Sequence, residues 1–503
     1  MKRSDGLFEL IKSMSKTEKR YFKIFSTHHA LKGEKGYIKL FDAIDKQEEY
    51  DETKLLKIFP GKTRHGAKNY LYNLILKCLR VYHTGKSIDL ELGDLIANVE
   101  LLYNKQLYQE CMKMLNKASD IALNSEKFLY IMMIFHWKYK VLTEMQNMEE
   151  LEAMIKAAPS KELSYMEQYF ICREHEWVIS EIAAIYYEKG PIRNNSDALA
   201  YEAIAGKVTG KNDSMPLRAQ ILSHYISLFN AFIRSDYPQA CHFTNNMIDT
   251  IESFPMFEKE YFRTYIKMLN NLNVFCLRLK KYDKMLECIK KVKALKSVSE
   301  ADSNTIFFFS SNMELAYCNA TGNFQAGIKT AEKLENKIQV CQRMFKQLYQ
   351  DFCLKLASLY FGTGNYAKSL QWLNKILNKE IESGFNNLEE AHIINLLVHY
   401  ELGHIDLLEY LIKQTYRFLY KKERLFQLET CILEFIKNEI FSGKSDQGIT
   451  EAFKSLRDKL VILSEDPFEK IALEDFDYIS WLESKIENRN FADIIKEKAK
   501  KQN

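Results

Sequence analysis

Apolar residues recur every three or four positions along most of the chain, which is the spacing of one face of an α-helix. The clearest stretch runs from Leu354 to Leu377 and holds the turn Gly364-Asn365-Tyr366 between two amphipathic segments. Glycine adopts the left-handed or tight backbone conformation that ends a helix, and the aromatic residue after the turn packs into the junction. The pattern therefore predicts a helical hairpin over these residues.

The same turn pattern returns along the chain at a nearly regular interval. Successive turns lie about 40 to 47 residues apart, with a mean period of about 42 residues. A short turn and a short connector leave about 17 or 18 residues for each helix. The period predicts about nine helical hairpins, which stack because each buries its apolar stripe against its neighbours. The residues that follow the turns are Tyr108, Tyr237, Tyr282, Phe324, Tyr366 and Ile405, and the other three turns precede about Met148, about Asn195 and about Asp446.

The hairpin from Leu354 to Leu377 resembles a tetratricopeptide repeat (TPR), with small Ala357 at a close helix contact and Tyr366 after the turn. Its period is longer than the 34 residues of the standard repeat. The resemblance implies an all-α fold, a right-handed superhelix of about nine TPR-like hairpins. It also implies a concave groove that binds a protein or peptide segment. The positions that match this groove are Asn270, Arg278, Asn312, Asn319, Phe361 and Tyr400.

The two ends of the chain depart from the repeat, so three parts are predicted. Residues 1–86 read as a basic domain of four or five helices, with a capping box at Ser15-Lys16-Thr17-Glu18 and a long helix from about residue 63 to residue 83. Residues 87–465 hold the TPR-like solenoid. Residues 466–503 return to an apolar pattern that predicts capping helices over the last hairpin.

The composition is typical of a folded, helical protein. Apolar residues make up 47% and charged residues 27% of the 503 positions, which excludes disordered and collagen-like classes. Only 7 prolines occur, which favours long helices. The longest wholly apolar stretch, from Phe128 to Phe135, is far shorter than the about 20 residues that span a bilayer. We therefore expect no membrane association.

The cysteines and the N-terminal residues bear on location. The ten cysteines form no C-x-x-C pair, and they sit singly in helical patterns. Such cysteines are typical of free thiols in a reducing compartment. Glu9 and Lys12 interrupt the apolar run that an export signal would need. We therefore expect a cytoplasmic protein.

No pattern in the sequence predicts catalysis. The signatures of hydrolases, kinases and dinucleotide-binding enzymes are absent. The histidines at His392, His399 and His404 lack the carboxylate base that a zinc protease would place between its ligands. We expect no catalytic residue, no metal site and no cofactor, and we expect that the protein is not an enzyme.

Charge is spread unevenly, although the net charge of the chain is only +4. Residues 1–90 hold 19 Lys and Arg against 11 Asp and Glu, and residues 53–88 hold 8 basic residues and no acid. One face of the predicted helix 63–83 carries only amides and cations. Cations contact phosphates, and asparagine pairs with adenine edges. The residues that would contact nucleic acid are Arg64, Lys68, Asn69, Asn73, Lys77 and Arg80.

Two functions follow from these patterns. The first is a non-enzymatic scaffold that binds a protein or peptide segment in the concave groove. The second is a regulator whose N-terminal domain binds nucleic acid while the solenoid senses a peptide or forms a homodimer. The alternative for the basic face is a solvated surface, or a surface that docks on the mildly acidic solenoid. Binding of nucleic-acid phosphates by the basic N-terminal domain would distinguish the second function from the first.

Overall fold

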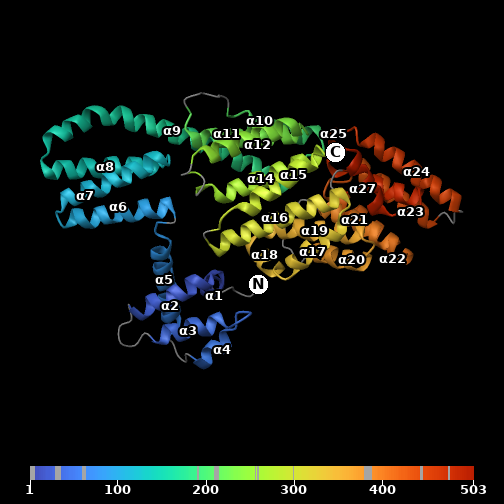
Figure 1. The fold of residues 1–503 in the computed structure, drawn as a ribbon, viewed down its shortest axis with the longest axis horizontal. Coiled ribbons are helices and arrows are strands. Elements are labelled where there is room, and N and C mark those ends of the chain that lie inside the picture. Colours follow the sequence, from blue (N-terminus) through green and yellow to red (C-terminus); the bar gives the residue numbers. More distant parts are fainter. Residues whose placement is uncertain are drawn as a thin grey trace. The chain divides into compact units, whose positions relative to one another are not determined.

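A computed structural model describes residues 6–28, 35–58, 64–85, 87–189, 192–208, 215–254, 257, 260–297, 299–378, 388–441, 446–473 and 476–502. These residues form helices and no strand, apart from an isolated bridge between Thr84 and Ser87 (Figure 1). The chain divides into two compact units. The first comprises Met1–Tyr169 and Val298–Asp302, and the second comprises Phe170–Ser297 and Ser303–Asn503.

The first unit begins with a bundle of short helices. The predicted capping box is formed at the start of α2, where the Ser15 hydroxyl accepts from the Glu18 N–H and the Glu18 carboxylate accepts from the Ser15 N–H. Phe22 and Phe41 are fully buried in the core of the bundle, and their ring centroids are 4.7 Å apart. The helices are α1 (Gly6–Ser13), α2 (Lys16–His28), α3 (Lys35–Asp45), α4 (Glu52–Ile58) and α5 (Arg64–His83).

Longer helices follow in the first unit, and neighbours in sequence pack against each other. They are α6 (Ile88–Asn104), α7 (Tyr108–Asn124), α8 (Phe128–Met145) and α9 (Met148–Lys189). α9 is one continuous helix of 42 residues that contains Pro159 and runs on into the second unit. The regular period predicted a connector between two shorter helices over this range. The prediction was wrong there because the helix continues past Pro159 without a connector.

The second unit continues the pattern of consecutive packed helices. Its helices are α10 (Asn195–Ala205), α11 (Leu217–Ile233), α12 (Tyr237–Ser253), α14 (Phe262–Arg278), α15 (Tyr282–Ala294), α16 (Glu300–Thr321), α17 (Phe324–Glu335), α18 (Ile338–Met344), α19 (Lys346–Gly362), α20 (Tyr366–Leu377), α21 (Leu388–Glu401), α22 (Ile405–Lys421), α23 (Gln427–Phe441), α24 (Asp446–Leu463), α25 (Pro467–Leu473), α26 (Tyr478–Ile486) and α27 (Phe491–Lys501).

Helices begin at all of the residues that were predicted to follow a turn, from Tyr108 at the start of α7 to Asp446 at the start of α24. In several of these turns the residue two positions earlier has a left-handed backbone. Glycine takes this position at Gly364, with φ +74°. Other turns place a residue with a side chain there, such as Gln106 and Lys280, with φ +60° and +57°. The same turn geometry is thus built with and without glycine.

The C-terminal helices fold back onto helices well before the last hairpin. Phe491 of α27 stacks on Phe324 of α17 and contacts Phe361 of α19. A Cβ atom added at Gly322 would lie only 2.7 Å from the backbone oxygen of Ala492, so the glycine permits this close approach. The predicted terminal cap therefore covers more of the unit than the last hairpin. Among the described helices none is long and apolar enough to span a bilayer.

Candidate functional site

Arg193 forms a buried ionic triad with Glu429 and Glu469 in the second unit. One guanidinium nitrogen lies 2.6 Å from a Glu429 oxygen, and another lies 2.7 Å from a Glu469 oxygen. The three side chains are 7%, 3% and 6% exposed. Burial alone would lower the pKa of Arg193, but the two carboxylates outweigh this effect and raise it. The guanidinium is therefore charged and shared by two anions.

The N-terminus of α23 offsets the second negative charge of the triad. Glu469 accepts hydrogen bonds from the backbone N–H groups of Gln427 (3.0 Å) and Leu428 (3.1 Å). Glu429 accepts one from the N–H of Phe426 (3.2 Å). The first N–H groups of a helix have no partner within the helix, and they attract negative charge. Both carboxylates are thus held by backbone as well as by the guanidinium.

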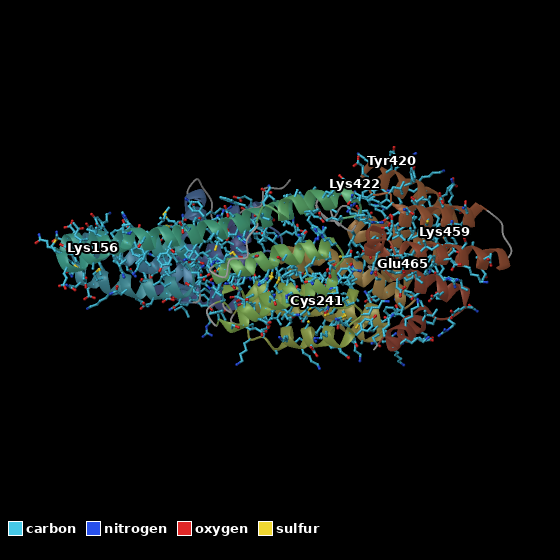
Figure 2. All side chains as sticks on the ribbon, turned by 90° about the horizontal axis from the view of Figure 1, so that it is seen from above. Lys156, Cys241, Tyr420, Lys422, Lys459 and Glu465 are labelled. Carbon is cyan, nitrogen blue, oxygen red and sulfur yellow. The ribbon has the colours of Figure 1, made fainter. Side chains whose placement is uncertain are left out.

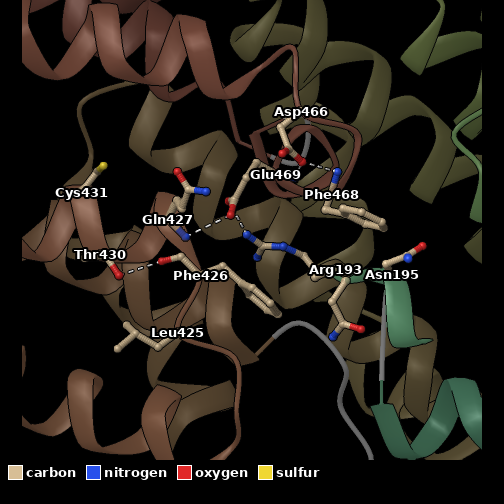
Figure 3. Close-up of a pocket in the computed structure, with 11 residues that line it drawn as sticks. Arg193, Asn195, Leu425, Phe426, Gln427, Thr430, Cys431, Asp466, Phe468 and Glu469 are labelled. Carbon is tan, nitrogen blue, oxygen red and sulfur yellow. Dashed lines mark hydrogen bonds and ion pairs between the residues drawn. The ribbon is translucent and has the colours of Figure 1, made fainter. Parts of the chain in front are cut away.

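Phe426 orients the arginine side chain (Figure 3). Its ring centroid is 4.3 Å from the central guanidinium carbon of Arg193 and 5.8 Å from that of Arg424. A cation over an aromatic face is attracted by the electrons of the ring. Arg424 also pairs with Glu389 at 3.4 Å. The aromatic ring and the carboxylates together fix the position of Arg193.

A cavity of about 680 Å³ opens beside the triad, within the size range of small-ligand sites. Its wall joins the start of α10, the start of α23 and the segment that leads into α25 (Figure 3). Two aromatic rings, four carboxamide or hydroxyl side chains and the charged groups contribute to it. The lining residues are Arg193, Asn194, Asn195, Leu425, Phe426, Gln427, Thr430, Cys431, Asp466, Phe468 and Glu469.

The charged groups of the wall are engaged within the protein. Besides the triad, Asp466 accepts hydrogen bonds from the N–H groups of Phe468 (2.8 Å) and Glu469 (3.2 Å). Asn195 and Gln427 differ from these, because both residues are exposed and neither side chain has a hydrogen-bond partner within the described ranges. A carboxamide both donates and accepts, which suits it to a peptide group.

The residues predicted to line a concave groove lie within helix packing instead. Phe361 is 2% exposed, and its ring contacts those of Phe476 and Phe491. Tyr400 is half-buried against Trp481. The C-terminal helices thus pack on the two rings that were predicted to line a groove, and the groove role of Phe361 and Tyr400 stays a prediction.

The predicted polar groove residues also serve neighbouring helices. Asn312 is buried and donates to the side-chain oxygen of Asn270 at 3.2 Å. Asn319 donates to the backbone oxygen of Lys355 at 3.0 Å. Arg278 is half-buried. None of these four side chains lines the cavity beside Arg193.

The predicted nucleic-acid face on α5 is smaller than expected. Lys68 pairs with Glu52 at 2.7 Å, and it lies over the ring of Tyr50. Its side chain is only 12% exposed, which leaves little of it open to a phosphate, and its predicted role as a phosphate contact stays a prediction. The side chain of Arg64 lies outside the described residues. The remaining predicted contacts are exposed, and they are Asn69, Asn73, Lys77 and Arg80.

Histidine and acidic side chains do not converge on a metal in the described part of the chain, which holds no group of three ligands suited to one. The Nδ1 atoms of His399 and His404 lie 3.0 Å apart. His392 packs on the ring of Phe418 instead. The expectation of no metal site stays a prediction.

The triad could not be predicted from the sequence. Glu429 and Glu469 lie 236 and 276 residues beyond Arg193, so no local spacing connects them. The sequence did offer one sign of a buried charge, because Glu429 lies between Leu428 and Ile432 in a strongly apolar helical pattern. A charge among core positions indicates a buried partner, but it does not identify that partner.

No family model matches the chain, and no curated protein matches it. Among solved structures, the crystal structure of the apo form of RapI is similar, with a TM-score of 0.38 and 14% sequence identity. The match spans 75% of this chain and 99% of that chain. The helices and their contacts within the described residues define the class of protein, an all-helical protein with consecutive packed helices.

Proposed function

We propose that the protein is a non-enzymatic, TPR-like interaction protein that binds an extended peptide segment in the cavity beside Arg193. The observation that carries this proposal is the state of the cavity wall. The charged side chains of the wall form ion pairs and hydrogen bonds within the protein. The side-chain amides of Asn195 and Gln427, in contrast, have no hydrogen-bond partner among the described residues. Peptide backbone offers N–H and C=O groups that match carboxamides, and Phe426 and Phe468 offer apolar contact to side chains.

The electrostatics favour an uncharged ligand segment. The positive guanidinium and the N–H groups at the start of α23 offset the negative charges of Glu429 and Glu469. Little net charge is therefore left to attract an ion. The interaction energy would come from apolar burial and from a few hydrogen bonds, as in other sites of this size. The ionic triad keeps the wall rigid, which lowers the entropic cost of binding.

A selection experiment tests this proposal. Random peptides displayed on phage are selected against the full chain, and the enriched peptides are resynthesised with a fluorophore for anisotropy measurements. The double substitution Asn195→Ala and Gln427→Ala removes two hydrogen-bonding groups worth roughly 1 kcal/mol each. We expect it to raise the Kd about tenfold or more.

Asn245→Ala is the matched control, because Asn245 is an exposed asparagine on α12 outside the cavity. It should leave the Kd unchanged. If the enriched peptides bind the double variant and the wild type equally, the cavity is not their site and the proposal fails.

A second function rests on a different observation, the exposed face of α5. Lys77 and Arg80 are exposed and form no ion pair with the described residues, and α5 contains no acid. Asn69 and Asn73 lie on the same face at helical spacing. We propose as the alternative that this face binds duplex nucleic acid, with the cations on phosphates and the asparagines on base edges.

Fluorescence anisotropy of a labelled duplex DNA across a salt series tests the alternative. Lys77→Ala with Arg80→Ala should weaken binding and reduce the slope of log Kd against log salt by about 2. Lys54→Ala is the control, because Lys54 is an exposed lysine that already pairs with Asp51. Absence of binding at low salt would exclude this function and leave the cavity proposal untouched.

A further inference from the structure

The outer face of α22 carries tyrosines and cations in one stripe. Tyr410, Tyr416 and Tyr420 are 63%, 48% and 69% exposed. The rings of Tyr416 and Tyr420 are nearly parallel, with an interplanar angle of 12° and centroids 6.1 Å apart. Residues three and four apart share a helix face, which aligns the tyrosines with the cations between them. We call this surface the α22 stripe, and it comprises Tyr410, Lys413, Tyr416, Arg417, Tyr420 and Lys421.

The C-terminal half of the α22 stripe is positively charged. Arg417 and Lys421 are exposed, and within the described ranges no carboxylate pairs with either of them. Lys422 adds a third exposed cation directly after the helix, beside Tyr420 in the side-chain view (Figure 2). The acids nearest in sequence are Glu409, which pairs with Lys413 at 2.7 Å, and the single residue Glu423. Cations therefore outnumber acids here.

We propose that the α22 stripe binds single-stranded nucleic acid. Bases would stack on the open faces of Tyr416 and Tyr420, while Arg417 and Lys421 would contact the phosphates. Interleaved aromatic rings and cations on one surface are what an unpaired strand requires, because its bases expose their planar faces and its backbone is anionic. Bases in a duplex are already stacked and do not offer these faces.

The distribution of apolar residues argues against a lipid surface as the partner. The exposed aliphatic residues of α22, Ile405 and Leu407, lie at the opposite end of the helix from the free cations. A helix that lies in a membrane interface keeps aliphatic and aromatic residues together on one face along its length. In α22 the end that carries the cations has exposed tyrosines, and the exposed aliphatic residues lie at the other end.

Anisotropy of a fluorescein-labelled 20-nucleotide poly-uridine RNA with the full chain tests this inference. The double substitution Tyr416→Ala and Tyr420→Ala should raise the Kd at least tenfold. Tyr416→Phe with Tyr420→Phe should keep the Kd within about twofold, because a phenyl ring still stacks. Arg417→Ala with Lys421→Ala should weaken binding and lower the salt slope by about 1 to 2. Tyr139→Ala, at a 50% exposed tyrosine of α8, is the control.

Three kinds of result would overturn the inference. The first is absence of RNA binding at low salt, or equal binding by the wild type and the Tyr416→Ala, Tyr420→Ala variant. The second is loss of RNA binding in the Lys77→Ala, Arg80→Ala variant while the α22 variants still bind RNA, which would assign the RNA site to α5. The third is equal affinity for a 20-base-pair duplex, or tyrosine-dependent binding to phosphatidylserine vesicles without RNA binding. Ultraviolet crosslinking followed by peptide mapping should find the RNA on residues 410–422, whatever the stability of the variants.

Discussion

At the scale of single residues, the charge on Arg193 matters more to the second unit than its exposed ion pairs do. Exposed pairs such as Lys454 with Glu451 are screened by water and contribute less than about 1 kcal/mol. Arg193 is different because its removal would leave Glu429 and Glu469 facing each other in the interior. Breaking a buried pair costs more than the pair contributes, because an uncompensated charge stays behind.

Arg193→Met should therefore lower the free energy of unfolding by about 3 to 5 kcal/mol. Urea denaturation followed by circular dichroism measures this loss. Lys454→Met is the matched control and should cost less than about 1 kcal/mol. A loss of similar size in the two variants would mean that the triad is not an important source of stability.

His392 makes stability depend on pH. Burial lowers the pKa of His392 to about 4, from an ordinary value near 6.5. The folded protein therefore resists protonation that the unfolded chain accepts, so stability is lost as the pH falls from about 6.5 towards 4. The loss should stay below the roughly 3 kcal/mol of the full shift, because the ring is partly exposed.

Thermal unfolding between pH 7 and pH 4.5 measures this effect. His392→Leu should flatten part of the decline in Tm at acid pH. His399 should still contribute a decline of its own, since burial and nearby His404 lower its pKa. An unchanged pH profile in His392→Leu would show that the ring is not protonated on unfolding.

At the scale of elements, the turns between helices explain both the success and the limits of prediction from sequence. Helix starts could be predicted because apolar spacing and the residue after each turn are local signals. The turn at Gly364 could be predicted from the sequence, since glycine favours positive φ. The turn at Lys280 adopts the same geometry at φ +57° without a glycine. There the packing of the two flanking helices overrides the preference of the residue.

Lys280→Gly should raise the free energy of unfolding by about 0.5 to 1 kcal/mol, because a side chain at positive φ is strained. Gly364→Ala should lower it by about 1 kcal/mol. The space around Gly364 is open, so only the backbone conformation opposes the added methyl group. Urea midpoints of the two variants measure both changes. Shifts of the same sign would contradict this account of the turns.

At the scale of the whole molecule, the decisive contacts are those that join distant segments. Phe476 packs its ring against Phe361 at 5.2 Å between centroids, and it stacks on Phe491. Neither this contact nor the triad leaves a local pattern, so the cavity could not be predicted from the sequence. The ring contacts involve Phe361, which the TPR resemblance placed in a groove.

Phe476→Ala should cost about 3 to 5 kcal/mol, because it opens a hole beneath the C-terminal helices. Phe254→Ala is the control, since Phe254 is 42% exposed. Limited proteolysis should then cleave the Phe476→Ala variant near α26 and α27 before it cleaves elsewhere. Equal protease resistance of the two variants would mean that these helices are held by other contacts.

The separation of 276 residues between Arg193 and Glu469 also sets a delay during synthesis. At a translation rate of about 5 to 20 residues per second, Arg193 waits roughly 15 to 55 seconds before its second carboxylate has been made. Until then the guanidinium and the first N–H groups of α23 lack the Glu469 carboxylate. The second unit therefore reaches its final form only after Glu469 has been made.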